Sequence, residues 1–409
     1  VNKNNLLFRQ ILMRNISIIG AGQAGLQLGI GLLKSGYNVS IYTRQKAEEV
    51  LNGNILSSPS MFHSALQCER KLGLNFWDKI CPENKTVTYT LSKATKPEIT
   101  LYWQGKTSQS YQAIDQRLKF SYWMEEFTRL GGQLIVQTVV IKDLNCITEQ
   151  QDLTIVTGGK GEISQLFPID ESRSIFNKAQ RVLCCLYVKD VEPRADSQGV
   201  RANVIPGVGE YFITPGLTIT GPCEMMLFEG LPGSAFDCWK DILRPDQRLT
   251  KACELLRRFV PWEAELCQKV KLTDEQATLQ GSYTPVVKKP TFRLSYGKPV
   301  LGLGDSILLN DPIGGQGANN ACQSATFFLN KIKEHESRLF TEEWMQETFE
   351  TYWKQSAQWA TKWTNLMLKP SKSFVSLLRA ASHQPNTANW LANGFDIPRK
   401  ILTEMDLNE

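Results

Sequence analysis

A glycine-rich turn near the start of the chain constrains its fold more than any other feature. Residues 16–19 read ISII, a β-branched run typical of a buried strand, and they continue directly into GAGQAG, which begins at Gly20. An apolar helical pattern follows up to Gly36, and VSIY at 39–42 predicts a second strand. Strand, G-x-G-x-x-G turn, helix and strand in this order are typical of a dinucleotide-binding βαβ unit.

Each glycine of this turn has a physical task toward a bound pyrophosphate. Gly20 makes the tight turn, Gly22 lets the backbone approach the phosphates, and Gly25 packs the helix against the strand. The N-terminus of the helix points its partial positive charge at the anion, so Gln23 and Ala24 belong to the predicted site as well. We therefore predict an α/β fold that binds a nucleotide cofactor here.

The second strand ends on residues that are unusual for such a fold. Where a carboxylate would accept a hydrogen bond from a ribose hydroxyl, the sequence has Thr43 followed by Arg44. A threonine hydroxyl can accept the same bond more weakly than a carboxylate does. We assign Thr43 and Arg44 to the cofactor site on the basis of this position.

A second motif far downstream indicates which cofactor is bound. PVLGLGD at 299–305 predicts a strand that ends at Asp305, and DPIGGQGANN at 311–320 precedes an apolar helical pattern at 321–332. This pair resembles the second flavin motif of glutathione-reductase-like monooxygenases, in which the aspartate holds the ribityl chain and the glycine turn places N–H groups over the flavin. A strand that turns at Gly158 fits between the two motifs in the order of that family.

The resemblance implies FAD and extends the list of cofactor residues. The added residues are Arg117, Gly158, Asp305, Pro312, Gly315, Gln316, Gly317, Ala318 and Asn319. Arg117 opens a predicted helix and matches the arginine that reaches the phosphate or ribose of the cofactor. An ordinary solvated arginine at a helix start is the alternative for this residue.

The composition limits the chemistry that side chains could perform. The 409 residues include three histidines, His63, His335 and His383, although acid–base catalysis and zinc binding most often use histidine. We therefore expect the cofactor to carry the reaction, and we predict no metal. The ten cysteines form no C-x-x-C pair, which favours a reduced cytoplasmic protein. A net charge of +5 gives no reason to expect nucleic acid, and no segment predicts a membrane span.

The flavin-binding motifs are separated by segments of a different kind. Alternating apolar residues at 181–191 and Pro-Gly turn signals across 200–231 predict an antiparallel sheet over the flavin. We predict a glutathione-reductase-like FAD-binding Rossmann domain, as in p-hydroxybenzoate hydroxylase, with an interleaved β-rich substrate domain and C-terminal helices. The predicted parts are an extension at 1–12, the FAD-binding domain at 13–57, 112–170 and 285–330, the substrate-binding domain at 58–111 and 171–284, and a helical segment at 331–409.

Together the motifs support a more specific resemblance. The residues similar to the styrene and indole monooxygenases are the first glycine run with Thr43, GLGD at 302–305, DPIGGQGAN at 311–319 and ATKWTN at 360–365. These proteins are the FAD-dependent epoxidase components of two-component systems, and they share the threonine in place of the acidic residue. The resemblance extends from about Met13 to the C-terminus.

The resemblance implies a reaction that suits a chain with few histidines. An NADH-dependent flavin reductase supplies reduced FAD, dioxygen adds to the flavin as a C4a-hydroperoxide, and the distal oxygen attacks an electron-rich double bond. No substrate proton has to be removed, so the protein has to position a small apolar aromatic substrate and exclude water. A homodimer is compatible with the resemblance.

The segment after the second strand predicts the substrate. The resemblance places Ser57, Ser58 and Pro312 at the reacting centre. It places Ser57, Met61 and Leu309 against the substrate. Styrene-type members have an asparagine and a histidine at the positions of Ser57 and Met61, and the indole-preferring branch lacks both, so we favour indole over styrene. Ordinary loop serines and a core methionine are the alternatives.

Two other functions stay open at this point. A single-component NAD(P)H-dependent aromatic hydroxylase is the first, although no second G-x-G-x-x-G follows a predicted strand. A non-catalytic binding protein on a flavoprotein fold is the second, and it would be expected to have lost a flavin motif. The absence of a W-x-W-x-I-P run argues against a flavin halogenase.

Overall fold

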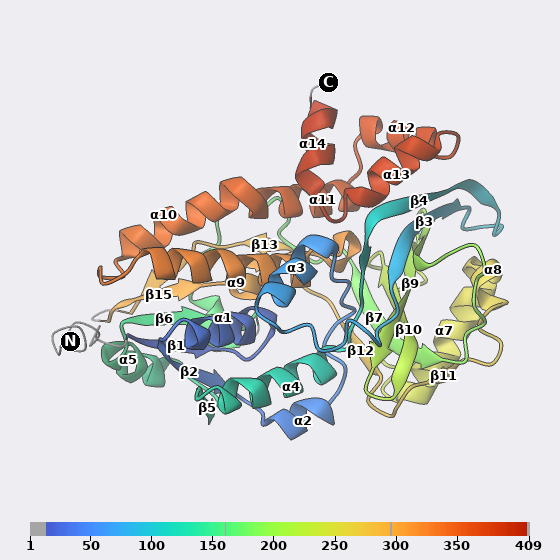
Figure 1. The fold of residues 1–409 in the computed structure, drawn as a ribbon. Helices are drawn as coiled ribbons and strands as arrows, with labels where there is room; N and C mark the ends of the chain where they lie inside the picture. Colours follow the sequence, from blue (N-terminus) through green and yellow to red (C-terminus); the bar gives the residue numbers. More distant parts are fainter. Residues whose placement is uncertain (1–13, 160, 295–296, 407–409) are drawn as a thin grey trace, which may run out of the picture.

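Two sheets with helices packed on them make up the protein (Figure 1). The computed structural model describes residues 14–159, 161–294 and 297–406. The predicted extension at 1–12 lies outside these residues. In Figure 1 the first sheet lies on the left, the second on the right, and the C-terminal helices lie above both.

The first sheet has six strands in the order β14-β15-β6-β1-β2-β5. Neighbouring strands are parallel except β14, which runs antiparallel to β15. The bounds are β1 Asn15–Ile19, β2 Asn38–Thr43, β5 Gln133–Val136, β6 Leu153–Val156, β14 Thr291–Arg293 and β15 Pro299–Gly302. Because β1, β6 and β15 are parallel neighbours, their carboxyl ends meet at one edge of the sheet.

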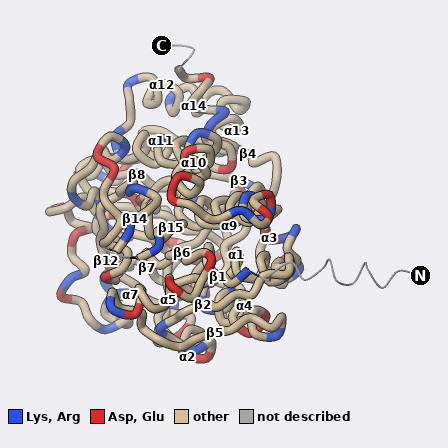
Figure 2. The backbone as a smooth tube through the Cα atoms, turned by 90° about the vertical axis from the view of Figure 1, so that its left-hand side faces the viewer, with Lys and Arg blue, Asp and Glu red and all other residues tan. Residues whose placement is uncertain are grey.

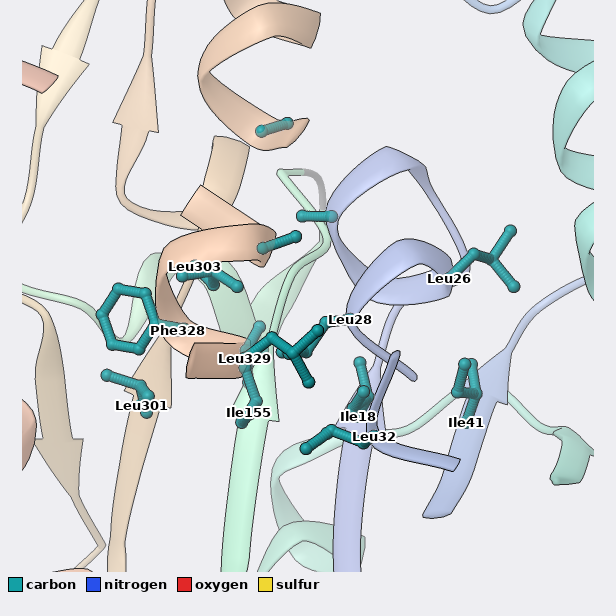
Figure 3. Close-up of a cluster of buried hydrophobic side chains, with 14 of the residues drawn as sticks. Ile18, Leu26, Leu28, Leu32, Ile41, Ile155, Leu301, Leu303, Phe328 and Leu329 are labelled. Atoms are coloured by element: carbon teal, nitrogen blue, oxygen red, sulfur yellow. The ribbon is translucent and has the colours of Figure 1, made fainter. Parts of the chain in front are cut away.

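Helices cover the first sheet and enclose its apolar core. They are α1 Gln23–Lys34, α2 Ala47–Leu51, α3 His63–Lys71, α4 Gln116–Arg129, α5 Ile141–Gln150, α6 Glu162–Gln165 and α9 Gly317–Glu334. Figure 3 shows side chains of α1, including Leu28, beside Ile155 of the sheet and Leu329 of α9. A Cβ on Gly31 would lie 2.5 Å from Leu329 Cδ2, so glycine at this position permits the close packing of α1 and α9.

The second sheet is almost entirely antiparallel, with the order β11-β7-β10-β9-β8-β3-β4. Its bounds are β3 Asn84–Ser92, β4 Ile99–Tyr111, β7 Val182–Lys189, β8 Gly199–Ile205, β9 Gly209–Thr218, β10 Gly221–Gly230, β11 Lys271–Leu272 and β12 Thr278–Gly281, which pairs with β7. Only β3 and β8 are parallel within this order. Helices α7 Pro245–Phe259 and α8 Pro261–Ala264 pack on one face. The other face packs against Ile55 and Ala113, which lie outside the sheet. The first sheet and its helices are called the first domain below, and the second sheet with α7 and α8 the second domain.

Short elements connect the two sheets and precede α9. They are β13 Val286–Val287, β16 Leu308–Leu309, and the 3-10 turns η3 Gly304–Ser306 and η4 Pro312–Gly314. Strands β13 and β16 pair with each other in an antiparallel ribbon. This ribbon leads the chain from the first sheet to η4 and α9.

Helices at the C-terminal end pack across both domains. They are α10 Glu342–Tyr352, a π-helical turn at Trp353–Ala357, α11 Gln358–Leu368, α12 Lys372–Ala381, α13 Pro385–Asn393 and α14 Pro398–Asp406. Asn389 and Asn393 of α13 accept hydrogen bonds from the backbone N–H groups of Lys106 and Ser108, at 2.7 and 2.8 Å. Helix α13 is thereby attached to β4.

Basic and acidic residues are interspersed along the backbone in Figure 2. Among the described residues, no helix combines the length and the apolar character that a bilayer crossing requires. The same residues contain no group of three or more His, Cys, Asp or Glu side chains arranged to hold a metal ion.

Candidate active site

Three glycine-containing turns meet at the carboxyl edge of the first sheet. Gly20 after β1 lies against the turn after β6, because a Cβ on Gly20 would lie 2.8 Å from the backbone nitrogen of Gly158. The turn after β6 in turn contacts the turn after β15, where a Cβ on Gly159 would lie 2.7 Å from the Cβ of Asp305. Segments that the sequence predicts as separate motifs therefore form one continuous surface.

Two helices begin at this surface, and both N-termini face open space. A Cβ on Gly304 would lie 3.1 Å from Ala24 of α1 and 3.7 Å from Ala321 of α9, so both helices start beside the same turn. Apart from their own neighbours in the chain, no atom of the described residues would lie within 4 Å of a Cβ on Gly22 or on Gly317. Neither helix has a side-chain cap at its N-terminus. This cradle of uncapped N–H groups fits the pyrophosphate and ring system of FAD.

The end of β2 borders the cradle on one side. The Thr43 hydroxyl donates to the Gln45 carbonyl at 3.2 Å and accepts from the Gln45 N–H at 3.4 Å, so it closes the local turn. The Arg44 guanidinium group contacts Gly161 in the segment that follows β6. The contacts of Thr43 and Arg44 with the cofactor stay predictions.

Asp305 is presented at the edge of the sheet by a turn that is firmly held. The Ser306 hydroxyl accepts from the Leu303 N–H at 3.0 Å and donates to the Val156 carbonyl at 2.8 Å. Ser306 is fully buried, whereas Asp305 is exposed. The hydrogen bond between the Asp305 carboxylate and a cofactor hydroxyl stays a prediction.

The turn before α9 is braced by two amide side chains. Asn319 accepts from the Phe62 N–H at 2.8 Å, and its NH₂ group donates to the carbonyls of Ser60 and Gly315, both at 2.7 Å. The Gln316 NH₂ group donates to two further carbonyls at 2.9 Å. Both amides are thus used within the protein, and the cofactor contacts predicted for these residues would come from backbone groups.

Gln23 likewise directs its side chain into the protein. Its NH₂ group donates to Gln27 and to Glu69, both at 3.0 Å. Glu69 also accepts from Lys119 at 2.8 Å in a buried ion pair. The predicted contribution of Gln23 to cofactor binding therefore falls to its backbone at the start of α1.

Arg117 begins α4 as predicted, but it is not solvated. It is fully buried, and its guanidinium group forms ion pairs with Asp115 at 2.8 Å and with Asp274 at 2.9 Å. It also donates to the Gly53 carbonyl and the Thr218 hydroxyl. Burial alone would lower its pKa, but the hydrogen bonds that it donates to both carboxylates raise it. The solvated alternative is wrong, and the predicted cofactor contact stays a prediction.

The segment with Ser57 lies under the second sheet. The Ser57 carbonyl accepts from the Tyr187 hydroxyl at 2.8 Å, which attaches the segment to β7. The Ser57 hydroxyl is buried and has no hydrogen-bond partner among the described residues. The Cys185 thiol of the same strand donates to the Ser57 carbonyl at 3.9 Å, and Ser58 lies close to this thiol. A buried hydroxyl without a partner is energetically costly, so this one calls for a partner.

The other predicted substrate residues differ in their surroundings. Met61 is 1% exposed and packs with Ala65, Leu66 and Cys322 between α3 and α9. These neighbours suit a core methionine, and its contact with substrate stays a prediction. Leu309 in β16 and Pro312 in η4 are both partly exposed, and their roles stay predictions.

An apolar face that sequence reasoning missed lies on the second sheet toward the first domain. Its buried members are Ile55, Ala113, Cys185, Tyr187, Cys223, Met225, Leu227 and Ala277, with Phe212 and Leu279 packed against them. Alternate residues of β7 and β10 supply most of this face, but the residues between them, such as Leu186 and Met226, are apolar and buried as well, so the sequence of these strands does not distinguish the two faces. The three histidines do not contribute to it: His335, for example, lies at the end of α9 and stacks on Phe340.

Comparison with known proteins supports the styrene monooxygenase family. Residues 159–265 match a family model described as the putative substrate-binding domain of styrene monooxygenase A. The chain is 27% identical over 399 residues to styrene monooxygenase StyA of Pseudomonas fluorescens, covering 95% of this chain and 94% of that protein. It is 26% identical over 401 residues to a StyA of Pseudomonas sp., with the same coverage.

Solved structures confirm the predicted fold class. A triple mutant of the flavin-dependent brominase Bmp2 has a TM-score of 0.66 at 14% identity, covering 96% of this chain and 99% of that one. The p-nitrophenol 4-monooxygenase PnpA of Pseudomonas putida has a TM-score of 0.63 at 13% identity, covering 96% and 98%. At these identities the likeness concerns the fold alone.

Proposed function

We propose that this chain is the oxygenase component of a two-component FAD-dependent monooxygenase, and that it epoxidises indole, with styrene-like aromatic alkenes as side substrates. The similarity to StyA over nearly the whole chain supports an aromatic alkene as the substrate class. The observation that carries the proposal is the segment 57–60, which links the apolar face to the start of α9: the Ser57 carbonyl accepts from the Tyr187 hydroxyl of that face, and the Ser60 carbonyl accepts from the Asn319 side chain of α9.

The structure suits a reaction in which the protein binds the cofactor, orients the substrate and excludes water. Bound reduced FAD would activate dioxygen, so that one oxygen atom enters the alkene, the other leaves as water and the flavin leaves oxidised. The uncapped N-termini of α1 and α9 would hold the cofactor. The apolar face would hold the substrate and keep water away from the reacting atoms.

Ser57 supports indole within this substrate class. Its buried hydroxyl has no partner among the described residues and can accept a hydrogen bond from the indole N–H. Styrene has no N–H group and would leave this hydroxyl unused. The reductase, the homodimer and the cytoplasmic location belong to the same proposal.

Replacing Ser57 separates substrate binding from cofactor binding. We expect Ser57→Ala to lower kcat/KM for indole by about 3- to 10-fold, the equivalent of one neutral hydrogen bond, and to leave styrene epoxidation and FAD affinity almost unchanged. Asp305→Ala is the comparison variant, and it should weaken FAD binding instead. Equal losses for indole and styrene, or a similar loss of FAD affinity in both variants, would contradict the assignment of Ser57.

The need for a separate reductase distinguishes the proposal from a single-component hydroxylase. With FAD and NADH or NADPH but no reductase, we expect the purified chain to oxidise the nicotinamide no faster than a blank, with or without indole. Addition of an NADH-dependent flavin reductase should start product formation. Rapid NAD(P)H oxidation by the chain alone, stimulated by indole, would favour the single-component alternative.

A further inference from the structure

Several ionisable side chains lie buried between the second sheet and the turn that precedes α9. Glu229 of β10 and Glu210 of β9 are register partners, and Asp311 is the residue before η4. Glu229 is fully buried, Asp311 is 2% exposed and Glu210 is 7% exposed. Neither the predicted flavin contacts nor the apolar face explains why three carboxyl groups gather here.

One of the three carboxylates is neutralised by an arginine. Arg181 Nε donates to Glu210 Oε2 at 2.6 Å, and Nη2 donates to Oε1 at 2.9 Å, in a bidentate pair. Nη1 donates to the Gln180 carbonyl at 2.9 Å. The hydrogen bonds of Arg181 are therefore directed at Glu210 and the backbone rather than at the other two carboxyl groups.

The protonation states of Glu229 and Asp311 depend on each other. Their carboxyl groups are within hydrogen-bonding contact, and neither oxygen of Glu229 has a donor among the other described residues. Two carboxyl groups in contact and away from water cannot both be ionised, so one proton lies between them. Asp311 accepts the Ile313 N–H at 3.2 Å, which favours the negative charge on Asp311 and the proton on Glu229.

We propose that Glu229 and Asp311 share one proton, and that this proton holds the 311–315 turn, and with it the N-terminus of α9, against the second sheet. Glu229 is thus a positioning residue that acts through Asp311. Asp311 caps η4, and the chain passes through Gly315, with φ +63°, into α9. The shared proton is inferred from the burial and the contact of the two carboxyl groups, whereas its effect on FAD binding rests on the proposed function.

The pair makes stability depend on pH in a definite direction. Burial, and then the charge of Asp311, raises the pKa of Glu229 well above its usual value of 4.5. The folded state therefore keeps a proton that the unfolded chain releases, and stability falls as pH rises from about 4.5 toward the folded pKa. Tyr283, which donates to the Asn310 carbonyl at 3.0 Å, also faces the pair, and burial keeps it protonated.

An infrared titration of the full-length protein without cofactor tests the shared proton. We expect a carbonyl stretch of a protonated carboxyl group at neutral pH that is lost in Glu229→Gln and disappears from the wild type only on alkaline titration. Glu224→Gln is the matched control, because Glu224 lies on the same strand and burial raises its pKa to about 7, yet it does not contact Asp311. A neutral-pH spectrum in which Glu229→Gln removes no carbonyl band would overturn the proposal.

The affinity for oxidised FAD, measured across the same pH range, tests the positioning role. We expect the affinity of the wild type for FAD to fall about tenfold or more as pH rises through the pKa of Glu229 in the folded protein. Above that pH both carboxylates are charged, and their repulsion releases the 311–315 turn. Glu229→Gln keeps a neutral donor, so its affinity should stay flat, whereas Glu224→Gln should follow the wild type. A wild-type affinity that stays flat while the carbonyl band titrates would overturn the positioning role but not the shared proton. Failure to bind FAD at any pH would instead contradict the proposed function.

Discussion

Gly22→Val is expected to abolish measurable FAD binding without unfolding the protein. Within the part of the chain that the structure describes, a Cβ on Gly22 would meet no atom within 4 Å beyond its chain neighbours, and the backbone there is extended, with φ −98°, so valine fits the chain itself. Its side chain would fill the space in front of α1 where the pyrophosphate is expected. Loss of about two charge-assisted hydrogen bonds corresponds to a decrease in affinity of about 100-fold or more.

Two further glycine substitutions show whether this effect is specific. Gly281→Val, at an equally open position in β12, should change neither FAD affinity nor thermal stability. Gly25→Ala should destabilise the fold by about 1–3 kcal/mol, because its Cβ would overlap the carbonyl oxygen of Gly20. Calorimetric binding and thermal unfolding of all three variants check the prediction. Normal FAD affinity in Gly22→Val would show that the cofactor does not lie at this turn.

Arg117→Ala is expected to give the largest loss of stability among single substitutions at the site. Asp115 and Arg117 are both fully buried, and Asp274 completes the pair of carboxylates around the guanidinium group. Removal of the arginine would leave these carboxylates without their cation, at a cost of about 3–5 kcal/mol. Urea unfolding monitored by tryptophan fluorescence measures the difference.

An exposed arginine in the same helix provides the control. Arg129 pairs with Glu126 at 2.6 Å, but its side chain is 68% exposed, so Arg129→Ala should leave the free energy of unfolding almost unchanged. Similar losses in both variants would show that the buried network does not stabilise the junction between the domains. Loss of FAD affinity in Arg117→Ala beyond what unfolding explains would support its predicted contact with the cofactor.

The sequence predicts the glycine-rich edge of the first sheet because its turns require glycine, and glycine is visible in the sequence. Gly20 and Gly304 adopt φ of +121° and +61°, conformations in which other residues are rare. The glycines in the sequence therefore predict this backbone geometry directly. The flanking strands are short apolar runs, and their order along the chain is sufficient to predict a parallel sheet.

Contacts between distant segments could not be predicted in this way. Nothing near Arg117 indicates that Asp274 completes its ion pairs, and nothing near Asp311 indicates Glu229 as its neighbour. Such pairs depend on how the second sheet lies over the first domain. The sequence therefore predicts the glycine turns that would bind the cofactor. It does not predict the side-chain contacts that keep these turns in place.

The residues that would contact the substrate were the least predictable part of the candidate site. Ser57 was identified as a site residue, but only the structure shows that its hydroxyl is buried without a partner among the described residues. Leu227 was missed because an inward-facing strand residue has the same composition signal as any core residue. Which face of β10 is turned toward the first domain is decided by packing between the domains.

The most direct test of the central claim uses chemically reduced FAD and isotopically labelled dioxygen, without reductase or nicotinamide. The protein is mixed anaerobically with reduced FAD and indole, or with styrene in a parallel sample, and labelled dioxygen is then admitted. We predict one labelled oxygen atom in each molecule of epoxide-derived product, with indole consumed faster than styrene. Decay of the mixture to hydrogen peroxide and oxidised FAD, with both substrates unchanged, would contradict the proposed function.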